Sequence, residues 1–570
     1  MLSGDEELPT EWPVNGTTGY DFLNMAGGVL SSTVGLADLV EMTRRYAAEE
    51  ADFAELLNQA KHQVIEELFS ADANRLRGFL AGIARHDRYG RDLIDEELDA
   101  AIQEVTVCLP VYRTYIDGLD IRPADRSLVE GAVSRATERR PDLNPALRLL
   151  SRVLLLEDAD HLSEAETRAR LDFIAAWQQF TGPVMAKGLE DTTLYRDPTL
   201  LSANAVGGER ELAEVSVRDF HSWLQNRFES WPLAMNATST HDSKRSEDVR
   251  ARIAVLSEVP DQWETAFEQL REASAADVRS VDDHPVPDGR AALMLFQTML
   301  GSWPLDDSEL PGYLERIQSY AIKAEREAKL RTTWIDQNMV YEEAFQGFIA
   351  DVLENERFLD AFQEFQNEIA FHGMLNSLSA TLMKMTAPGI PDFYQGTEIW
   401  DFSLVDPDNR RPVDYDKRRA LLDQISSDAT PTSLLGDWKS GAIKLFLIQR
   451  ALRTRSEFRP LFEQGRYVPL DVQGDRAGNV IAFARVLDGR WAVTVVPRLT
   501  ARMARESGEP LGQFPLGAGP WSDTRINLPG DAPSSWEQPL LSEQLDTEDG
   551  SILLADAFRQ LPVALLTGTT

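Results

Sequence analysis

The sequence predicts an α/β protein with more than one domain, and three observations support this prediction. Residues 36–230 place apolar positions three and four residues apart, which is typical of amphipathic helices. Residues 367–387 read as a helix that Pro388-Gly389 ends, and the short apolar strand IPDFY and a polar loop follow, as in a β/α unit. Past about residue 430, alternating β-branched segments such as GNVIAFARVL predict a small antiparallel β domain.

Length and charge narrow the class of protein. A chain of 570 residues exceeds one compact core, so two or three domains are expected. The net charge of −36 argues against nucleic acid or an anionic membrane as a partner and suits a neutral or cationic ligand. The single cysteine, Cys108, leaves no internal disulfide framework and fits a reducing, cytoplasmic setting. No run approaches 18 apolar residues, and the acidic N-terminus is typical of neither a signal peptide nor a membrane anchor.

Individual elements follow from local patterns. Residues 1–35, with GTTGYDFLN at 16–24, read as a loop that leads into a helix. Residues 44–69 and 163–180 have helical spacing, and Ser163 with Glu166 forms a capping box at the start of the second segment. The run LAMNATSTHD reads as a strand that ends in a polar turn.

The motifs exclude several chemistries. The seven histidines are scattered with no metal-ligand spacing, no glycine-rich phosphate loop follows a strand, and no GxSxG nucleophile elbow is present. Neither a metal nor a cofactor is therefore expected. Carboxylates, Arg, Asn, Tyr and Trp gather instead in the loops at strand ends. Planar polar groups beside aromatic rings suit a sugar, which offers hydroxyls to bridge and an apolar ring face to stack on.

The stretch TSTHDSKRSEDVRAR at 238–252 allows two interpretations of Asp242. An Asp before a charged helix is commonly an N-cap, and the dipeptide also occurs at His86-Asp87, which reads as a surface helix end. The alternative is a carboxylate that works on a substrate at the end of a strand. The loop DNRRPVDY allows the same two kinds of interpretation: a solvated surface loop or a loop that binds a ligand.

Longer motifs carry a family resemblance. Residues 237–258 and 388–415 closely resemble two strand-end motifs of the maltooligosyl trehalose synthases, α-amylase-like (β/α)₈-barrel enzymes of glycoside hydrolase family 13. GTTGYD, LPVYRTY, PVMAKGLEDTTLYR and YAIKAEREAKLRTTW match the same family in the same order. The resemblance implies an α/β fold: the C-terminal part of a TIM barrel with a large helical insertion and a small C-terminal antiparallel β domain. The implied domains are the end of barrel strand 5 and its loop (1–35), the helical insertion (36–230), barrel strands 7 and 8 (231–425) and the β domain (430–570).

The resemblance also implies an activity. Enzymes of this family move the terminal glucose of a maltooligosaccharide within the site, which changes the reducing-end α-1,4 bond into an α,α-1,1 bond. Asp242 falls on the family's third carboxylate, which holds sugar hydroxyls and stabilises the developing positive charge, and His241 on its neighbour. The further substrate-binding residues implied are Lys244, Arg245, Lys187, Glu190, Asp191, Tyr195, Arg196, Tyr394, Gln395, Glu398, Asp408 and Arg410. Lys244 and Arg245 are equally open to an outward-facing interpretation.

Two carboxylates that the family uses are not matched. The chain begins a few residues after the general-acid Glu, and no segment resembles the motif of the nucleophile Asp, so an N-terminal truncation is expected. A half-barrel would expose an unpaired sheet edge. Within the matched region, Asp197-Pro198 and Ala205 depart from the family pattern. The alternatives to an autonomous synthase are a non-catalytic glucan-binding remnant, one half of a split enzyme that needs the missing half-barrel, and an amylase-type hydrolase.

Overall fold

The computed structural model describes residues 8–9, 11–47, 52–208, 215–427, 430–508 and 512–570. They form two compact units. The described part of unit 1 is 52–196 with 327–329, and that of unit 2 is 8–9, 11–47, 197–208, 215–326, 330–427, 430–508 and 512–570. These boundaries come from contacts in space, and they differ from the boundaries of the four domains predicted from the sequence. Those four domains stay a prediction.

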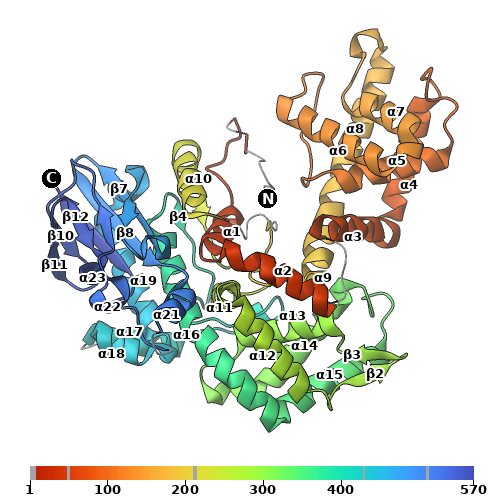
Figure 1. Cartoon of the computed structure of the whole chain (residues 1–570). Helices are drawn as coiled ribbons and strands as arrows, with labels where there is room; N and C mark the ends of the chain where they lie inside the picture. Colours follow the sequence, from red (N-terminus) through yellow and green to blue (C-terminus); the bar gives the residue numbers. More distant parts are fainter. Residues whose placement is uncertain (1–7, 10, 48–51, 209–214, 428–429, 509–511) are drawn as a thin grey trace. The chain divides into compact units, whose positions relative to one another are not determined.

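Helices are the only regular secondary structure among the described residues of unit 1 (Figure 1). The predicted capping box begins its longest helix, where Ser163 N donates to Glu166 Oε2 at 2.8 Å and Glu166 N donates to Ser163 Oγ at 3.3 Å. Leucines, valines and aromatic residues from the helices share one core around the fully buried Trp177. The elements are α3 (Phe53–Leu68), α4 (Ser70–Ala84), α5 (Asp95–Cys108), α6 (Pro123–Arg139), α7 (Asn144–Leu154), α8 (Glu164–Met185), the π-helix η3 (Ala186–Thr193) and α9 (Leu194–Arg196).

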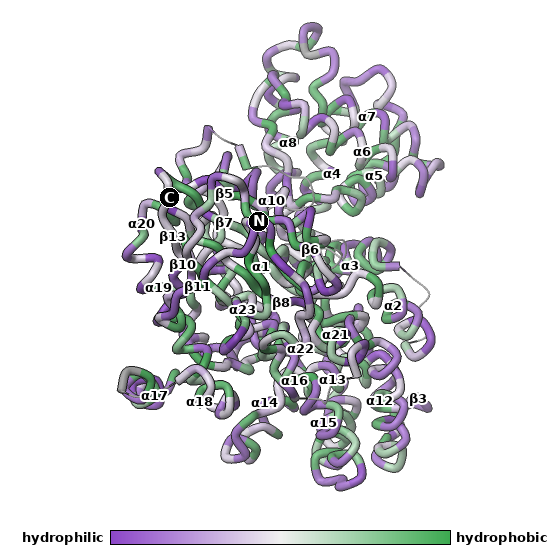
Figure 2. The backbone as a smooth tube through the Cα atoms, turned by 60° about the vertical axis from the view of Figure 1, so that its left-hand side comes forward, coloured by the Kyte–Doolittle hydropathy of each residue, from purple (hydrophilic) through white to green (hydrophobic). Residues whose placement is uncertain are grey.

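The predicted helix at 44–69 is only partly confirmed. Helix α2 (Thr33–Ala47) ends in unit 2, and α3 begins at Phe53 after the N-cap Asp52, whose side chain accepts from Glu55 N at 2.8 Å. Residues 48–51 lie outside the described residues. The predicted helix after the GTTGYD loop is confirmed as α1 (Tyr20–Val29), much of which is green, and thus hydrophobic, in Figure 2.

Helix α16 (Glu356–Thr386) is the central element of unit 2. Positions 368–379 and 381–386 are all buried, so this C-terminal part of the helix is covered on every side. It ends where the sequence predicts, just before Pro388-Gly389. The other helices of the unit are α10 (Val217–Ser230), α11 (Glu247–Ala254), α12 (Pro260–Ala273), α13 (Gly289–Ser302), α14 (Leu310–Ala328), α15 (Met339–Glu354), α17 (Tyr415–Ser427), α18 (Pro431–Gly436), α19 (Ala442–Glu457), α20 (Arg459–Gln464), α21 (Thr500–Ser507), α22 (Ala518–Trp521) and α23 (Leu554–Ala557).

The antiparallel strands predicted past about residue 430 are confirmed, and they belong to unit 2. Strands β7 (Val480–Leu487) and β8 (Arg490–Pro497) form an antiparallel hairpin inside a six-stranded sheet of order β11-β10-β13-β8-β7-β5, and β12-β9-β6 forms a second sheet. Alternate side chains of β7 and β8 enter one buried cluster. The other strands are β5 (Arg466–Pro469), β6 (Asp471–Gln473), β9 (Arg525–Asn527), β10 (Ser535–Gln538), β11 (Glu543–Asp546), β12 (Ser551–Leu553) and β13 (Ala564–Thr569).

The two strands that the sequence places before polar loops are very short. β1 (Met235–Asn236) and β4 (Ile390–Pro391) pair in parallel, and β2 (Arg279–Val281) with β3 (His284–Val286) forms a separate hairpin. The predicted strand IPDFY is thus reduced to its first two residues. Within the described chain no single helix is long and apolar enough to cross a membrane, although α1 and α2, bent by 94°, pass that test as a pair.

Candidate active site at the β1–β4 edge

Strands β1 and β4 bring two polar loops together in unit 2. Met235 pairs with Ile390 and Asn236 with Pro391, and Asp392 N donates to Asn236 O at 3.0 Å. Because parallel strands end at the same edge, the turn after β1 and the loop after β4 leave the sheet side by side. The loops stay in contact further on, where Ser246 N donates to Ser403 O at 3.0 Å.

The His241–Asp242 pair lies at the tip of the turn after β1. Thr240 N donates to Ser243 Oγ at 2.9 Å, and Asp242 N donates to Thr240 Oγ1 at 3.1 Å, which closes a compact turn. Thr240 Oγ1 also donates to Tyr20 Oη at 3.2 Å, so α1 supports the turn from one side. The imidazole Nε2 of His241 lies 3.0 Å from Asp242 Oδ2, and the two side chains are 64% and 55% exposed. Both are therefore accessible to a ligand.

The N-cap interpretation of Asp242 is wrong. Helix α11 begins at Glu247, and its N-cap position is Ser246. Asp242 lies in the preceding turn, where its side chain is paired only with His241 among the contacts of the described residues.

Asn409 ties the second loop to this turn. Its Nδ2 donates to His241 O at 3.0 Å, and Tyr394 Oη donates to Asn409 O at 3.2 Å. Tyr394, predicted to bind substrate, therefore supports the backbone that holds His241. Nothing in the sequence pattern singled out Asn409, which stands inside the charged run DPDNRR.

Lys244 and Arg245 do not face outward. Their exposed fractions are 6% and 1%, so the outward-facing interpretation is wrong. Arg245 Nη2 donates to Tyr320 Oη at 2.6 Å, and its guanidinium lies 5.7 Å from the centre of that ring. Arg245 therefore anchors the turn to α14 from inside the protein.

A buried ionic cluster fixes the bases of both loops. Lys444 Nζ lies 2.7 Å from Glu247 Oε1 and 2.8 Å from Asp248 Oδ2, and Lys384 Nζ donates to Thr238 Oγ1 at 2.7 Å and lies 3.3 Å from Glu247 Oε2. Two ammonium and two carboxylate groups thus balance in charge. Burial raises the pKa of Glu247, but the Lys384 and Lys444 ammoniums outweigh burial and hold that pKa below its ordinary value. We call these four charged residues the buried cluster.

The buried cluster reaches the loop after β4 as well. Asp401 N donates to Asp248 Oδ2 at 2.8 Å, and Ser246 Oγ donates to Asp401 O. Burial raises the pKa of Asp401 to about 6. The sequence did carry a signal for the cluster, because Lys384 and Lys444 each interrupt an apolar helical run (ATLMKMTA and AIKLFL).

Most other residues predicted in the loop after β4 build its walls. Asp408 accepts from Arg316 Nε and Nη2 at 2.8 and 2.9 Å and is 11% exposed, and Glu398 accepts from Arg418 Nε at 2.8 Å. Arg410 is exposed and lies 3.7 Å from Asp406. Gln395 lines a cavity of about 460 Å³ in which Asp242 and His241 take no part.

The predicted residues of the KGLEDTTLYR segment belong to unit 1, on η3 and α9. Lys187 Nζ lies 2.6 Å from Asp191 Oδ2, and Glu190 Oε1 accepts from Tyr112 Oη. Arg196 Nε donates to Ala328 O at 2.7 Å, and Tyr195 is buried. A π-helix in the middle of a long helical run often marks a functional site. These five residues belong to unit 1, whereas His241 and Asp242 belong to unit 2.

The structure explains in part the two departures from the family pattern, Asp197-Pro198 and Ala205. Asp197 Oδ1 accepts from Thr199 N at 3.0 Å and its backbone oxygen accepts from Asn204 Nδ2 at 2.7 Å, so the residue shapes its own turn. Ala205 is 2% exposed and cannot face a ligand in this conformation.

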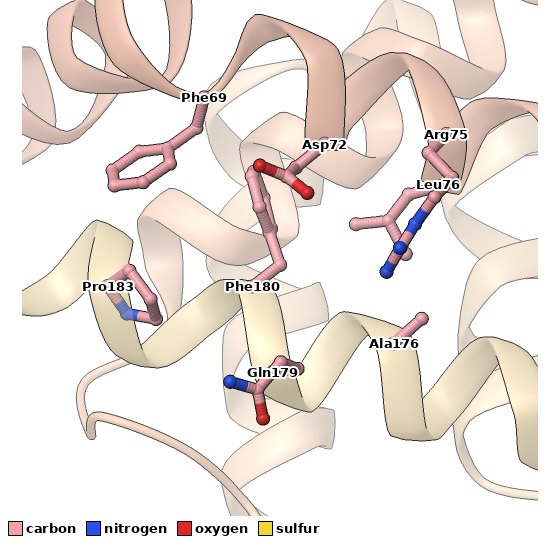
Figure 3. Close-up of a pocket in the computed structure, with 8 residues that line it drawn as sticks. All are labelled: Phe69, Asp72, Arg75, Leu76, Ala176, Gln179, Phe180 and Pro183. Atoms are coloured by element: carbon pink, nitrogen blue, oxygen red, sulfur yellow. The ribbon is translucent and has the colours of Figure 1, made fainter.

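Unit 1 also has a small cavity of about 200 Å³ between α4 and α8 (Figure 3). Phe69 and Phe180 line one part, and the Asp72 and Arg75 side chains point toward it from α4. It contains none of the predicted site residues.

An exposed carboxylate beside an imidazole, set at the carboxyl edge of parallel strands among polar loops, is the arrangement of an α/β protein that handles a polar ligand. No family model matches the chain. Curated relatives named "Putative maltooligosyl trehalose synthase", from two strains of Mycobacterium tuberculosis, are 32% identical over 569 residues, which is 99% of this chain and 64% of theirs. The maltooligosyltrehalose synthase structure from Arthrobacter ramosus has a TM-score of 0.81 and 31% identity, with 100% of this chain and 65% of that chain covered.

A second solved structure, a hypothetical maltooligosyl trehalose synthase from Sulfolobus tokodaii, has a TM-score of 0.73 and 27% identity and covers 100% of this chain and 64% of that chain. The resemblance inferred from the motifs is confirmed: the chain is a homologue of the maltooligosyl trehalose synthases over the part of them that it matches, and it has the fold of that part. It spans 64% of the length of the curated relatives that it matches. The barrel numbering of β1 and β4 as strands 7 and 8 stays a prediction.

Proposed function

We propose that the chain serves maltooligosyl trehalose synthesis, the intramolecular transfer that turns the reducing-end α-1,4 bond of a maltooligosaccharide into an α,α-1,1 bond. The observation that carries the proposal is the exposed His241–Asp242 pair, 3.0 Å apart, on a turn that the matched family motif supplies and buried contacts fix. An open carboxylate on a rigid base can hold sugar hydroxyls and stabilise positive charge at the reacting carbon. The reaction is placed in the cytoplasm, consistent with a single cysteine.

In this proposal Asp242 acts with two carboxylates that the family motifs place outside the matched residues. A nucleophile forms the glycosyl intermediate and a general acid protonates the leaving oxygen, while Asp242 binds the sugar that is being distorted. Water must be excluded, because it would otherwise hydrolyse the intermediate. Lys187, Glu190, Asp191, Tyr195 and Arg196, all in unit 1, are proposed to bind glucan as well.

One observation favours a second interpretation, in which the chain is one half of a split enzyme or a glucan-binding protein. The cross-strand partners Met235 and Ile390 are apolar yet 37% and 38% exposed, and Leu233 beside them is 42% exposed. A parallel sheet is normally covered on both faces, so a two-stranded one with exposed apolar partners is typical of a sheet that further strands complete.

The test is to incubate the chain with maltopentaose and to follow reducing ends and total carbohydrate. Synthesis lowers the reducing ends at constant carbohydrate, and hydrolysis raises them. The assay is repeated with added polypeptide that contains the part of the Arthrobacter ramosus protein which this chain does not match. Activity that needs the addition supports the split enzyme, whereas activity of the chain alone means that the two unmatched carboxylates are not required.

Asp242→Asn provides the control within the site, with an expected loss of about 100-fold or more in any arm that is active. Asp416→Asn, whose side chain is 92% exposed on α17, should leave the rate unchanged. If no arm is active, maltopentaose binding by calorimetry decides between a glucan-binding protein and no glucan function at all.

A further inference from the structure

The 460 Å³ cavity of unit 2 is bounded by four parts of the chain. The segment before α14 and its first turns contribute Asp306 and Arg316, and the loop after β4 contributes residues including 395–396 and 399–403. Helix α17 contributes Lys417, and the segment before α19 contributes Lys439. Figure 2 shows α17 with purple, hydrophilic stretches, in accord with its charged residues. The size lies within the range of small-molecule sites, about 300–1,000 Å³.

The walls of this cavity are already fixed. The Arg316 guanidinium is held by both oxygens of Asp408, at 2.8 and 2.9 Å, and Arg418 is held by Glu398. The indole of Trp400 lines the cavity and its Nε1 donates to a backbone oxygen at 2.6 Å. A site whose walls need no reordering loses less free energy on binding.

Two lysines that line the cavity have no side-chain partner among the described residues. Lys417 and Lys439 make no side-chain hydrogen bond or ion pair with any residue that the structure describes, and both line the cavity. Carboxylates line it as well, including Asp401 and Asp414, so neither an anion nor a cation finds a surface of one sign. Donors and acceptors interleaved beside an indole match a neutral polyhydroxylated ligand.

We infer that this cavity is a carbohydrate-binding site separate from the His241–Asp242 turn, and that it takes a short neutral oligosaccharide. The inference goes beyond the proposed function, because it requires no chemistry at Asp242. Asn409 connects the two places: it lines the cavity, and its side-chain amide donates to His241 O at 3.0 Å. An occupied cavity therefore contacts the residue that holds the turn.

The experiment is calorimetric titration of maltotriose into the full chain, the double variant Lys417→Ala/Lys439→Ala, Asp242→Ala, and Arg419→Ala as a matched control. Arg419 lies on the same helix as Lys417, is 73% exposed and does not line the cavity. Thermal melting of each variant checks that the fold is kept, which the exposure of these side chains favours. Inorganic phosphate is titrated in parallel as a small anion.

The expected result is maltotriose binding that the double variant weakens at least tenfold and that Arg419→Ala leaves unchanged, with binding at the cavity retained in Asp242→Ala. Equal binding by the double variant and Arg419→Ala overturns the inference, and so does a cavity that binds phosphate but not maltotriose. Loss of all binding in Asp242→Ala alone overturns it too, while it leaves the proposed function intact. If the synthase assay fails but the cavity still binds maltotriose, the inference about the cavity stands and the proposed function does not.

Discussion

The side-chain amide of Asn409 donates a hydrogen bond to the backbone oxygen of His241 across 3.0 Å. This bond joins the loop after β4 to the tip of the turn after β1, where the candidate carboxylate Asp242 is exposed. The base of the same turn is fixed separately, through Thr238 and the buried cluster. The turn is thus held at two levels, and the two can be tested independently.

Replacing Asn409 by Ala should loosen the tip of the turn and leave its base intact. A lost hydrogen bond of this kind contributes about 1 kcal/mol, so we expect amide exchange over residues 238–244 to quicken several-fold. Exchange measured by mass spectrometry over the β7–β8 hairpin serves as the internal control and should not change. Unaltered exchange at 238–244 would show that the Asn409 bond does not restrain the turn.

Replacing Lys444 by Met should destabilise unit 2 strongly. The change removes one of two buried cations and leaves Glu247 and Asp248 with a single balancing ammonium, Lys384. Breaking a buried ion pair from one side costs about 3–5 kcal/mol, because the other charge stays buried without its partner. The measurement is the free energy of unfolding in urea.

Lys439→Met is the matched control for that prediction. Lys439 is an exposed lysine five residues earlier, so its change should stay within about 0.5 kcal/mol. If Lys444→Met costs no more than this control, the buried cluster does not hold the two loops.

How much of this arrangement could be predicted from the sequence depends on how far apart in the chain the interacting residues lie. The end of α16 at Pro388-Gly389, the strand before THDS and the β7–β8 hairpin follow from local patterns, because backbone restraint and side-chain alternation act over a few residues. The residues that face the ligand edge were placed through motif resemblance. Asp242 could not be separated from an N-cap by composition, since the helix start depends on where Ser246 meets the second loop.

The buried cluster could not be predicted from local sequence patterns. Glu247 and Asp248 open a helix in the run SEDVRAR, a pattern that is usual for a solvated surface. They are buried because Lys384 and Lys444, 137 and 196 residues further on, meet them inside the unit. Likewise, Asp408 and Glu398 read as sugar ligands but pair with arginines of α14 and α17. Such pairings depend on tertiary packing, which no local pattern encodes.

Glu258 should make the stability of unit 2 depend on pH. Its Oε2 accepts from the first-turn amides Ala501 N at 2.9 Å and Arg502 N at 3.2 Å, which caps α21. Burial raises the pKa of Glu258 to about 7, above the ordinary 4.5, although the amides and Arg498 oppose this shift. Between pH 4.5 and 7 the folded state therefore binds more protons than the unfolded state. The free energy of unfolding should fall as pH rises through this window.

The variant Glu258→Gln isolates this effect, because the amide oxygen can still accept from both backbone groups but cannot ionise. The difference in unfolding free energy between the variant and the native chain should grow from about pH 4.5 to 7 and then level off. Urea unfolding at a series of pH values measures it. Parallel curves at every pH would mean that Glu258 titrates as an ordinary surface carboxyl does.

Gly188 should be indispensable to the π-helix of unit 1. A Cβ added there would lie 2.7 Å from Lys61 Cγ and 3.2 Å from Lys61 Cα, closer than side chains pack. Lys61 cannot move aside easily, because its Nζ donates to Val107 O at 3.1 Å and Leu109 O at 2.8 Å at the end of α5. Gly188→Ala must therefore push η3 away from α3, at a cost of about 1–3 kcal/mol.

The matched control for Gly188→Ala is Gly78→Ala, in the interior of α4. A Cβ at Gly78 meets no atom within 4 Å, so the change should add about 0.5–1 kcal/mol of stability through helix propensity. Thermal melting of the two variants should therefore shift in opposite directions. If both variants gain stability instead, η3 must have space for a side chain at position 188 despite the close contact with Lys61. In that case the packing of the KGLEDTTLYR segment against α3 is not what positions Glu190 and Asp191.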